Sequence, residues 1–504
     1  MEYVLLALVL IPVLVCPLFM LLPSQYPQLT RYVAALTGGV LFGLSLLVFV
    51  VYQFDGGAGL RYELQWDWLE NVGFLGENGI TFYLGVDGIG APLVLLNGVV
   101  ILAAVFVSWN ITHRTKDFFV LLFLLVSGVY GVFVSQDLFF FFFWYEVAVL
   151  PMYLLIAVWG SSSHFGTFTR TKEYGAMKLT MMLVAGSVLI FIGIFALFVE
   201  AGAGTFDMTE IRRVGEEGGI DEDFQKWCFP LFMVGFGVLA GMWPLHTWSP
   251  DGHVAAPTGV SMLHAGVLMK LGAFGILRVG IMLLPEGADF WAPVLMTLGV
   301  TGALYGAVSA LTQTDLKYMV GYSSVSHMGY VLMGLASMNE IGVNGAVLQM
   351  FAHGVMTALM FTNVGAVYDQ AHIRDMTQFG GLAKQMPRHS AFFTIAGLSS
   401  LGLPGLAGFV AEFHIFVGVF KAGYWWAGGL GILAAAITAT YILRMLARAY
   451  FGPANEKWAD LKEMRIGEQF SAALLIAMIL FMGLWPMPFI DRISQTVETI
   501  PGIN

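Results

Sequence analysis

Charged side chains are scarce in this chain: they make up 11% of its 504 residues, whereas 58% are hydrophobic and the mean hydropathy is +0.78. An average water-soluble domain carries about 25% charged residues, so the composition excludes that class. The net charge is −10, which provides no basic face for nucleic acid. The composition predicts a polytopic membrane protein that lies in the lipid bilayer.

Cysteine and nucleotide-binding motifs are also nearly absent. Cys16 and Cys228 lie in or beside apolar segments and fit neither a disulfide framework nor a metal-ligand spacing. No glycine-rich dinucleotide fingerprint, P-loop or nucleophile elbow occurs. The first apolar run lacks a basic region and a cleavage site, so we expect a retained first span. We therefore expect no redox cofactor bound through cysteine and no nucleotide chemistry in this chain.

Long apolar runs are what the chain has instead. We count about fourteen runs of roughly 20 residues, the length needed to cross a ~30 Å hydrocarbon core. Backbone groups in lipid must bond internally, and the runs are too long for barrel strands, so an all-α bundle is predicted. An even count places both termini on one side. Lys and Arg concentrate in the opposite loops, which favours termini on the outer, periplasmic side of an inner membrane.

Two of the predicted helices are interrupted by proline. Helix seven breaks at Pro244 and helix twelve at Pro404, and the five-helix offset between them predicts two inverted five-helix repeats, as in transporters with discontinuous helices. Ordinary proline kinks are the alternative. The expected regions are N-terminal helices one to three with an outer loop, a first half-channel unit, a second inverted unit, and an amphipathic segment with the last helix: 1–116, 117–284, 290–450 and 451–504. Within the last region, 452–467 fits an amphipathic helix.

Several ionisable side chains fall inside the apolar runs, where each costs on the order of 2.5–3.5 kcal/mol to insert. Glu146 is expected ~12 Å deep in helix five and Lys270 ~18 Å deep in helix eight, at about 1.5 Å per residue. Arg278 is expected to snorkel to the outer interface. One titratable group on each of several helices indicates proton or cation handling, and the candidate relay residues are Glu146, Lys270, His327, His353 and Glu412. Lys178 lies one turn into helix six, where either snorkelling or a functional role fits.

The histidines around the first break form a second group. His246, His253 and His264 fit no zinc motif, so no metal site is predicted there. We expect the rings of His253 and His264 to satisfy polar groups at the broken helix ends.

Six motifs together resemble a known family. PLHTWSPDGHVAAP, LHAGVLMKLGAFGILR, FWYEVAVLPMYLLI, DLKYMVGYSSVSHMGY, QMFAHGVMTALMF and GLPGLAGFVAEF are similar to the antiporter-like membrane subunits of proton-pumping NADH:quinone oxidoreductase, respiratory complex I. Glutamate at 412, where a paralogue carries lysine, resembles chain M. The resemblance implies paralogous membrane subunits and a hydrophilic NADH-oxidising arm as partners, and no cofactor here.

The resemblance also implies roles for the candidate residues. Glu146 would be the helix-five carboxylate and Lys270 the central relay lysine. His327 and His353 would link two half-channels, and Glu412 would be the last group; Lys178 would be the helix-six lysine.

One position departs from the family pattern. The family carries a lysine five residues before the proline of the PLH motif, where it pairs with the helix-five glutamate; here that position is Leu239. We hypothesise that Lys178 or a lysine of a neighbouring subunit replaces it, or that pumping is impaired. The alternatives to a complex I subunit are a D-type subunit of a multisubunit cation/proton antiporter, a subunit of a membrane-bound hydrogenase, and a pump-impaired structural subunit.

Overall fold

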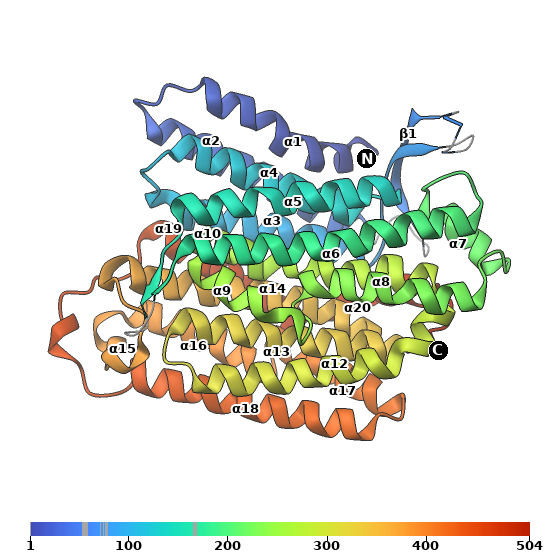
Figure 1. Ribbon diagram of the computed structural model, residues 1–504. Coiled ribbons are helices and arrows are strands. Elements are labelled where there is room, and N and C mark those ends of the chain that lie inside the picture. Colours follow the sequence, from blue (N-terminus) through green and yellow to red (C-terminus); the bar gives the residue numbers. More distant parts are fainter. Residues whose placement is uncertain are drawn as a thin grey trace.

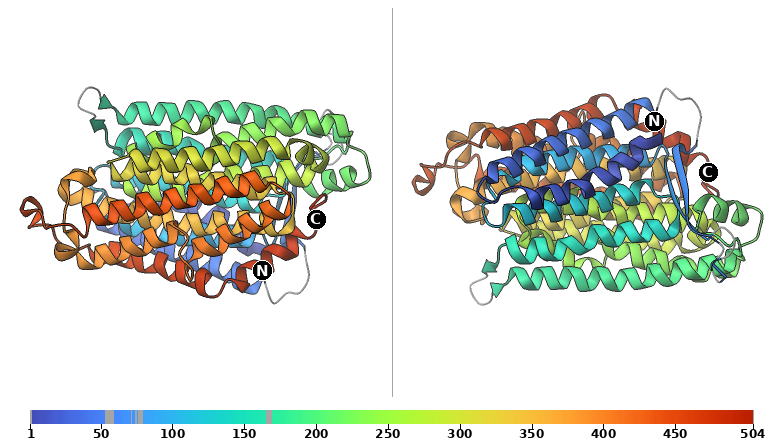
Figure 2. Two further views of the ribbon diagram at one scale, coloured as in Figure 1. Left: turned by 90° about the horizontal axis from the view of Figure 1, so that it is seen from below. Right: turned by 90° about the horizontal axis from the view of Figure 1, so that it is seen from above.

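The protein is a bundle of long helices that run side by side. The computed structural model describes residues 2–52, 59–70, 72–73, 75, 79–164 and 169–503. Both termini, β1 and α7 lie at one end of the bundle, which we call the terminal end, and α15 lies at the opposite, distal end (Figure 1). Two further views show the same parallel arrangement from below and above (Figure 2).

The first half of the chain contains α1 to α9, with two short strand pairs. The elements are α1 Glu2–Leu21, α2 Pro27–Val51, β1 Arg61–Leu69, β2 Ile80–Val86, α3 Gly90–Val107, η1 Ser108–Asn110, α4 Thr115–Val134, α5 Leu138–Trp159, β3 Ser163–His164, β4 Thr169–Arg170, α6 Lys172–Ala201, α7 Met208–Glu216, α8 Glu222–Ala240, η2 Leu245–Thr247 and α9 Trp248–Ala255.

The second half is helical throughout its named elements. They are α10 Thr258–Leu263, η3 His264–Leu268, α11 Met269–Gly275, η4 Ile276–Ile281, α12 Pro285–Thr312, α13 Leu316–Ala336, α14 Glu340–Ala371, η5 Met376–Gln378, α15 Leu382–Gln385, α16 Pro387–Ser400, α17 Ala407–Lys421, α18 Trp425–Ala449, η6 Glu456–Trp458, α19 Ile466–Leu484 and α20 Met487–Val497. Segments η3 and η4 are π-helical, and together with α10 and α11 they form one continuous span.

Polar side chains at the loop boundaries set where several helices begin. Asp137 accepts hydrogen bonds from two backbone amides of the first turn of α5, and Asp315 does the same for α13. Asn339 accepts from one amide at the start of α14, that of Gly342. Such caps satisfy amides that have no partner inside the helix. The loop over residues 54–88 holds the antiparallel β1–β2 pair, although 54–58, 71, 74 and 76–78 lie outside the described residues.

Both predicted helix breaks are present. Helix seven is interrupted between α8 and α9, where Gly241 has a φ of +74° and the Trp248 indole donates to the Val238 carbonyl at 2.9 Å. Helix twelve is interrupted between α16 and α17, where Gly402 and Gly405 have φ of +73° and +91°. Glycine adopts these left-handed conformations without steric cost, which is why the breaks fall there.

The structure confirms a polytopic helical membrane protein. By length and composition, 12 helical segments among the described residues are able to cross a membrane. The predicted total of fourteen requires α13 and the α16–α17 pair to cross as well. That total, the inverted repeats and the four regional boundaries stay predictions.

Two predictions for the last region are wrong. Segment 452–467 is no amphipathic helix: apart from η6 and the start of α19 it is irregular, because Asn455 and Trp458 bond to the Gln378 carbonyl and hold the segment against the distal loops. The last run is two helices, α19 and α20. A proline at 486 between them has no amide to continue a helix.

Candidate functional site

Lys270 lies in the span Thr258–Ile281, which is buried within the protein, and makes two close contacts. Its side chain is fully buried in α11. The ammonium nitrogen Nζ donates to the Ala265 carbonyl in η3 and lies 2.5 Å from Nδ1 of His353 in α14. A buried ammonium needs such partners because its desolvation is costly. Lys270 and His353, predicted separately, are therefore direct neighbours.

Two glycines make that contact possible. An ideal Cβ on Gly354 would lie 2.6 Å from the Gly266 carbonyl oxygen, and one on Gly266 would lie 3.1 Å from the Gly354 carbonyl oxygen. The backbones of η3 and α14 thus touch one turn from Lys270 and next to His353. Small residues allow this close approach between membrane helices.

His327 in α13 continues the chain of contacts. Its ring centroid is 5.3 Å from that of His353. Its Nε2 lies 3.0 Å from the Ser400 hydroxyl, and its Nδ1 lies 3.1 Å from the Gln349 amide nitrogen. Nδ1 also lies 3.4 Å from Oε1 of Glu412, on α17 just after the second break. The structure therefore brings together Lys270, His353, His327 and Glu412, which we call the relay row.

At the second break, the backbone of Gly402 lies against the Glu412 carboxylate, with no side chain between them. An ideal Cβ on Gly402 would lie 2.8 Å from Oε2 of Glu412. We expect Gly402→Ala to destabilise the protein by about 1 kcal/mol or more, through its positive φ alone, and to displace the carboxylate from His327. Thermal unfolding and proton transport of the purified complex check this. Gly39→Ala is the matched control, because no atom lies within 4 Å of a Cβ there; an equal loss in both variants would contradict the prediction.

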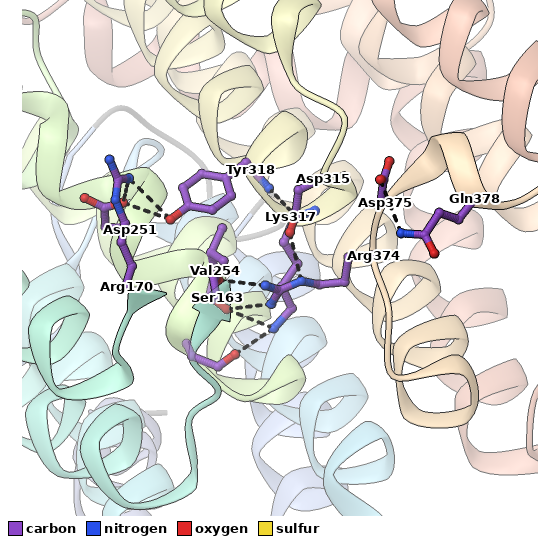
Figure 3. A network of polar contacts seen from close by, with 11 residues as sticks. Ser163, Arg170, Asp251, Val254, Asp315, Lys317, Tyr318, Arg374, Asp375 and Gln378 are labelled. Carbon is purple, nitrogen blue, oxygen red and sulfur yellow. Dashed lines mark hydrogen bonds and ion pairs between the residues drawn. The ribbon is translucent and has the colours of Figure 1, made fainter. Parts of the chain in front are cut away.

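Lys178 does not belong to the relay row. Its Nζ lies 2.8 Å from Asp251 of α9, which also binds the Arg170 guanidinium and accepts from the Tyr318 hydroxyl at 3.1 Å (Figure 3). This cluster lies at the distal end of the first break. Asp251 lies in the SPDGH motif that resembles the family, but it was not predicted as a site residue. Its cationic partners come from distant parts of the chain, so the sequence does not show the pairing.

Glu146 has no ion pair with any residue that the structure describes. Its carboxylate is partly buried, Oε1 has no hydrogen-bond partner, and the Ser187 hydroxyl of α6 is its polar neighbour. Because Lys178 binds Asp251, the hypothesis that Lys178 replaces the missing lysine is wrong. Leu239 itself is fully buried.

Arg278 does not snorkel as predicted. It is 6% exposed, and its guanidinium lies 2.6 Å from Asp87, which in turn accepts from the backbone amides of Ile89 and Gly90. A carboxylate from the loop before α3 was available, so the guanidinium pairs inside the protein.

The side chains of His253 and His264 do not form hydrogen bonds to the helix ends at the first break. The rings of His253 and His264 are fully buried with centroids 4.2 Å apart, and no nitrogen of either ring has a hydrogen-bond partner in the described chain. In the residues the structure describes, no group of three His, Cys, Asp or Glu is arranged to hold a metal.

A helical membrane bundle with two broken helices and a buried Lys–His–His–Glu row defines a membrane subunit of the ion-translocating class. The chain belongs to the family described as NADH:quinone oxidoreductase/Mrp antiporter, TM, whose model matches residues 135–438.

Curated relatives and solved structures agree with that family. The chain is 36% identical to NAD(P)H-quinone oxidoreductase chain 4 1 of Synechococcus sp. over 492 residues, covering 95% of this chain and 89% of the relative. It superposes on a chain of respiratory complex I from Thermus thermophilus with a TM-score of 0.86, 26% identity and 98% coverage of both chains. A chain of the Mrp complex from Dietzia sp. has the same fold, with a TM-score of 0.86, 17% identity and coverage of 99% of this chain and 97% of that one.

Proposed function

We propose that this chain is the proton-translocating M-type membrane subunit of an NAD(P)H:quinone oxidoreductase, and that it moves protons through the relay row. The single observation that carries the mechanism is that Lys270, His353, His327 and Glu412 are successive neighbours. The curated relatives named as chain 4 of NAD(P)H-quinone oxidoreductase support the enzyme complex. Electron transfer takes place in other subunits, including a hydrophilic arm, and this chain carries no cofactor.

The relay row suits proton transfer between neighbouring groups. A proton leaves the Lys270 ammonium for Nδ1 of His353, passes to His327, and reaches the Glu412 carboxylate. Imidazole accepts a proton on one nitrogen and releases one from the other, so each ring is restored after it hands the proton on. Each transfer changes the charge beside the next group and thereby its proton affinity.

The orientation and the neighbours follow from the same proposal. The termini lie on the periplasmic side of the inner membrane, as the Lys and Arg distribution favours. Paralogous membrane subunits flank this chain, and a lysine of one of them pairs with Glu146 across the subunit boundary, because this chain has Leu239 where its relatives have their own lysine. The cation/proton antiporter alternative has weaker support, since the Mrp likeness at 17% identity concerns the fold alone.

Glu412 provides the direct test of this function. We expect Glu412→Gln to lower NAD(P)H-driven proton transport into vesicles by about 100-fold, the usual loss when a positioned acid or base is removed. Glutamine keeps the size and removes the titratable group.

The matched control is Glu468→Gln, a second buried carboxylate outside the relay row. Glu468 is 5% exposed and accepts from the Arg465 amide at 2.9 Å, a bond that glutamine retains. Proton transport is expected to stay at the level of the unmodified complex. Undiminished transport in the Glu412→Gln complex would overturn the proposed function.

A further inference from the structure

A polar cavity at the distal end of the bundle has no residue of the relay row in its wall. Its volume is about 310 Å³, which is room for a phosphate group and several waters at ~30 Å³ each. The cavity lies where α2 and α4 begin, and the turn between α1 and α2 lies at this end of the bundle (Figure 1). Its polar wall residues include Thr30, Thr112, Arg114, Lys116 and Asp117. We call it the α2–α4 cavity.

Neither of the two helices that begin here has a side chain that caps its first turn. Tyr26 precedes α2 and Arg114 precedes α4, and neither side chain accepts a hydrogen bond from the helix amides. Asp137 and Asp315, by contrast, accept from such amides at the start of α5 and α13. The positive ends of two helix dipoles therefore meet at the cavity. Uncapped helix beginnings of this kind favour a negatively charged group.

The side chains around the cavity carry more positive than negative charge. Asp117 is the one carboxylate among the wall residues that the structure describes, and it already binds the Arg114 guanidinium at 2.7 Å. Lys116 and the buried Arg31, which directly follows Thr30, each donate to a backbone carbonyl, at 3.3 and 3.1 Å. Neither cation forms an ion pair with a described residue. Burying a guanidinium without a counter-charge is costly, so an anion in the cavity would stabilise this end of the bundle.

Thr30 contributes an unused hydroxyl to the wall. The residue is 1% exposed, and its Oγ1 has no hydrogen-bond partner in the described part of the chain. The hydroxyl of Thr115, another wall residue, donates to the Ile111 carbonyl at 3.0 Å. Buried polar groups in proteins almost always have a partner. The Thr30 hydroxyl therefore indicates that a group bound in the cavity accepts its hydrogen bond.

Exposed apolar and aromatic side chains beside the cavity indicate a lipid as the source of this group. Met20 and Leu21 at the end of α1 are exposed, as are Tyr26 and Tyr32 on either side of the start of α2. The Tyr32 ring packs edge-on against Trp109, with centroids 5.6 Å apart. Tyrosine and tryptophan gather at the depth of lipid headgroups. The cavity therefore lies at headgroup depth, with apolar surface for acyl chains next to it.

We propose that the α2–α4 cavity binds the phosphate of an anionic phospholipid from the leaflet at the distal end. The phosphate accepts hydrogen bonds from the Thr30 hydroxyl and from first-turn amides of α4, while Lys116 and Arg31 supply the counter-charge. The acyl chains lie against the exposed apolar side chains of α1 and α2. Phosphatidylglycerol fits this chemistry, whereas the choline group of phosphatidylcholine brings a positive charge toward the cations. The site is independent of proton translocation by the relay row.

Photo-crosslinking tests the site in the whole complex. A Tyr26→p-benzoylphenylalanine complex is placed in nanodiscs of equal amounts of phosphatidylcholine and phosphatidylglycerol and illuminated, and the adducts on this subunit are identified by mass spectrometry. Tyr26 is exposed and directly precedes Pro27 of the wall. We expect phosphatidylglycerol adducts to exceed phosphatidylcholine adducts by about tenfold or more. Equal amounts of the two adducts, or a cross-link to a neighbouring subunit in their place, would overturn the proposal.

Two substitutions distinguish a built site from general attraction to a positive surface. Thr30→Val removes the hydroxyl without changing the net charge, and we expect it to lower the adduct ratio about threefold. Lys116→Gln removes one cation and is expected to lower the ratio about fivefold. The control is Lys457→Gln, which removes an exposed cation at the distal end outside the cavity and is expected to keep the ratio. An unchanged ratio in Thr30→Val, or equal losses in Lys116→Gln and Lys457→Gln, would contradict the site.

Inorganic phosphate separates a lipid headgroup from a free anion. Millimolar phosphate is added to the nanodiscs before illumination, and chloride at the same ionic strength is the control. We expect the adduct ratio to stay the same in both, because the acyl chains hold the lipid beside the cavity. A ratio that falls to one with phosphate but not with chloride would assign the cavity to free phosphate and show that the lipid is the wrong ligand.

Discussion

Replacing Lys270 with methionine is expected to lower proton transport by about 100-fold or more, because Lys270 is the buried cation that contacts His353 at the start of the relay row. Methionine has a similar volume and no charge, so the surrounding packing persists. The measurement is proton uptake by vesicles containing the whole complex, expressed per electron transferred from NAD(P)H.

Lys421→Ala is the control for this variant, since Lys421 is an exposed lysine at the end of α17. Its proton yield is expected to match that of the unmodified complex. The pump-impaired alternative makes the opposite prediction for Lys270→Met, namely an unchanged proton yield of the whole complex. That outcome would show that the other subunits do all of the pumping and that Leu239 marks a lost function.

Replacing Gly354 with leucine is expected to abolish transport without removing any titratable group. A Cβ at this position would lie 2.6 Å from the Gly266 carbonyl and equally close to Leu96. The added side chain therefore forces η3 away from α14 and separates Lys270 from His353. Overpacking of this kind costs about 1–3 kcal/mol, occasionally more, so thermal unfolding of the complex is measured beside transport.

Gly39→Leu is the matched control, because its Cβ meets open space on the exposed side of α2. It is expected to keep both stability and transport. A smaller variant, Gly354→Ala, separates folding from function, since it adds one methyl group at the same contact. Full transport in an assembled Gly354→Ala complex would contradict the claim that the helix approach sets the Lys270–His353 distance.

The sequence predicted the broken helices and the central members of the relay row, because proline, glycine and buried charge leave a strong local signal in an apolar chain. Depth along each helix placed Lys270, His353 and His327 near the same level, and the structure confirms that they are neighbours. Spacing along the chain cannot show which helices pack together. The pairing of Lys178 with Asp251, and of Arg278 with Asp87, depends on contacts between segments far apart in sequence, so both were missed.

The prediction of an amphipathic helix over 452–467 was wrong for a different reason. Its alternation of charged and apolar residues fits one helix face, yet side-chain bonds to the distal loops compete with helix formation. The His253–His264 pair was misread because a histidine beside a broken helix is expected to cap it. In the structure, the Trp248 indole and backbone turns form the hydrogen bonds at the break that were expected from the histidines.

The four groups of the relay row lie at similar depths along their helices, which limits the electrical work of moving a proton between them. A charge that crosses a membrane against its potential requires about 2.3 kcal/mol per 100 mV. Lys270, His353, His327 and Glu412 lie near the middle of their helices, so a proton that moves along the row travels parallel to the membrane and performs almost no electrical work. The membrane voltage therefore opposes only the vertical steps that fill and empty the row, and it leaves the horizontal transfers to be governed by local proton affinities.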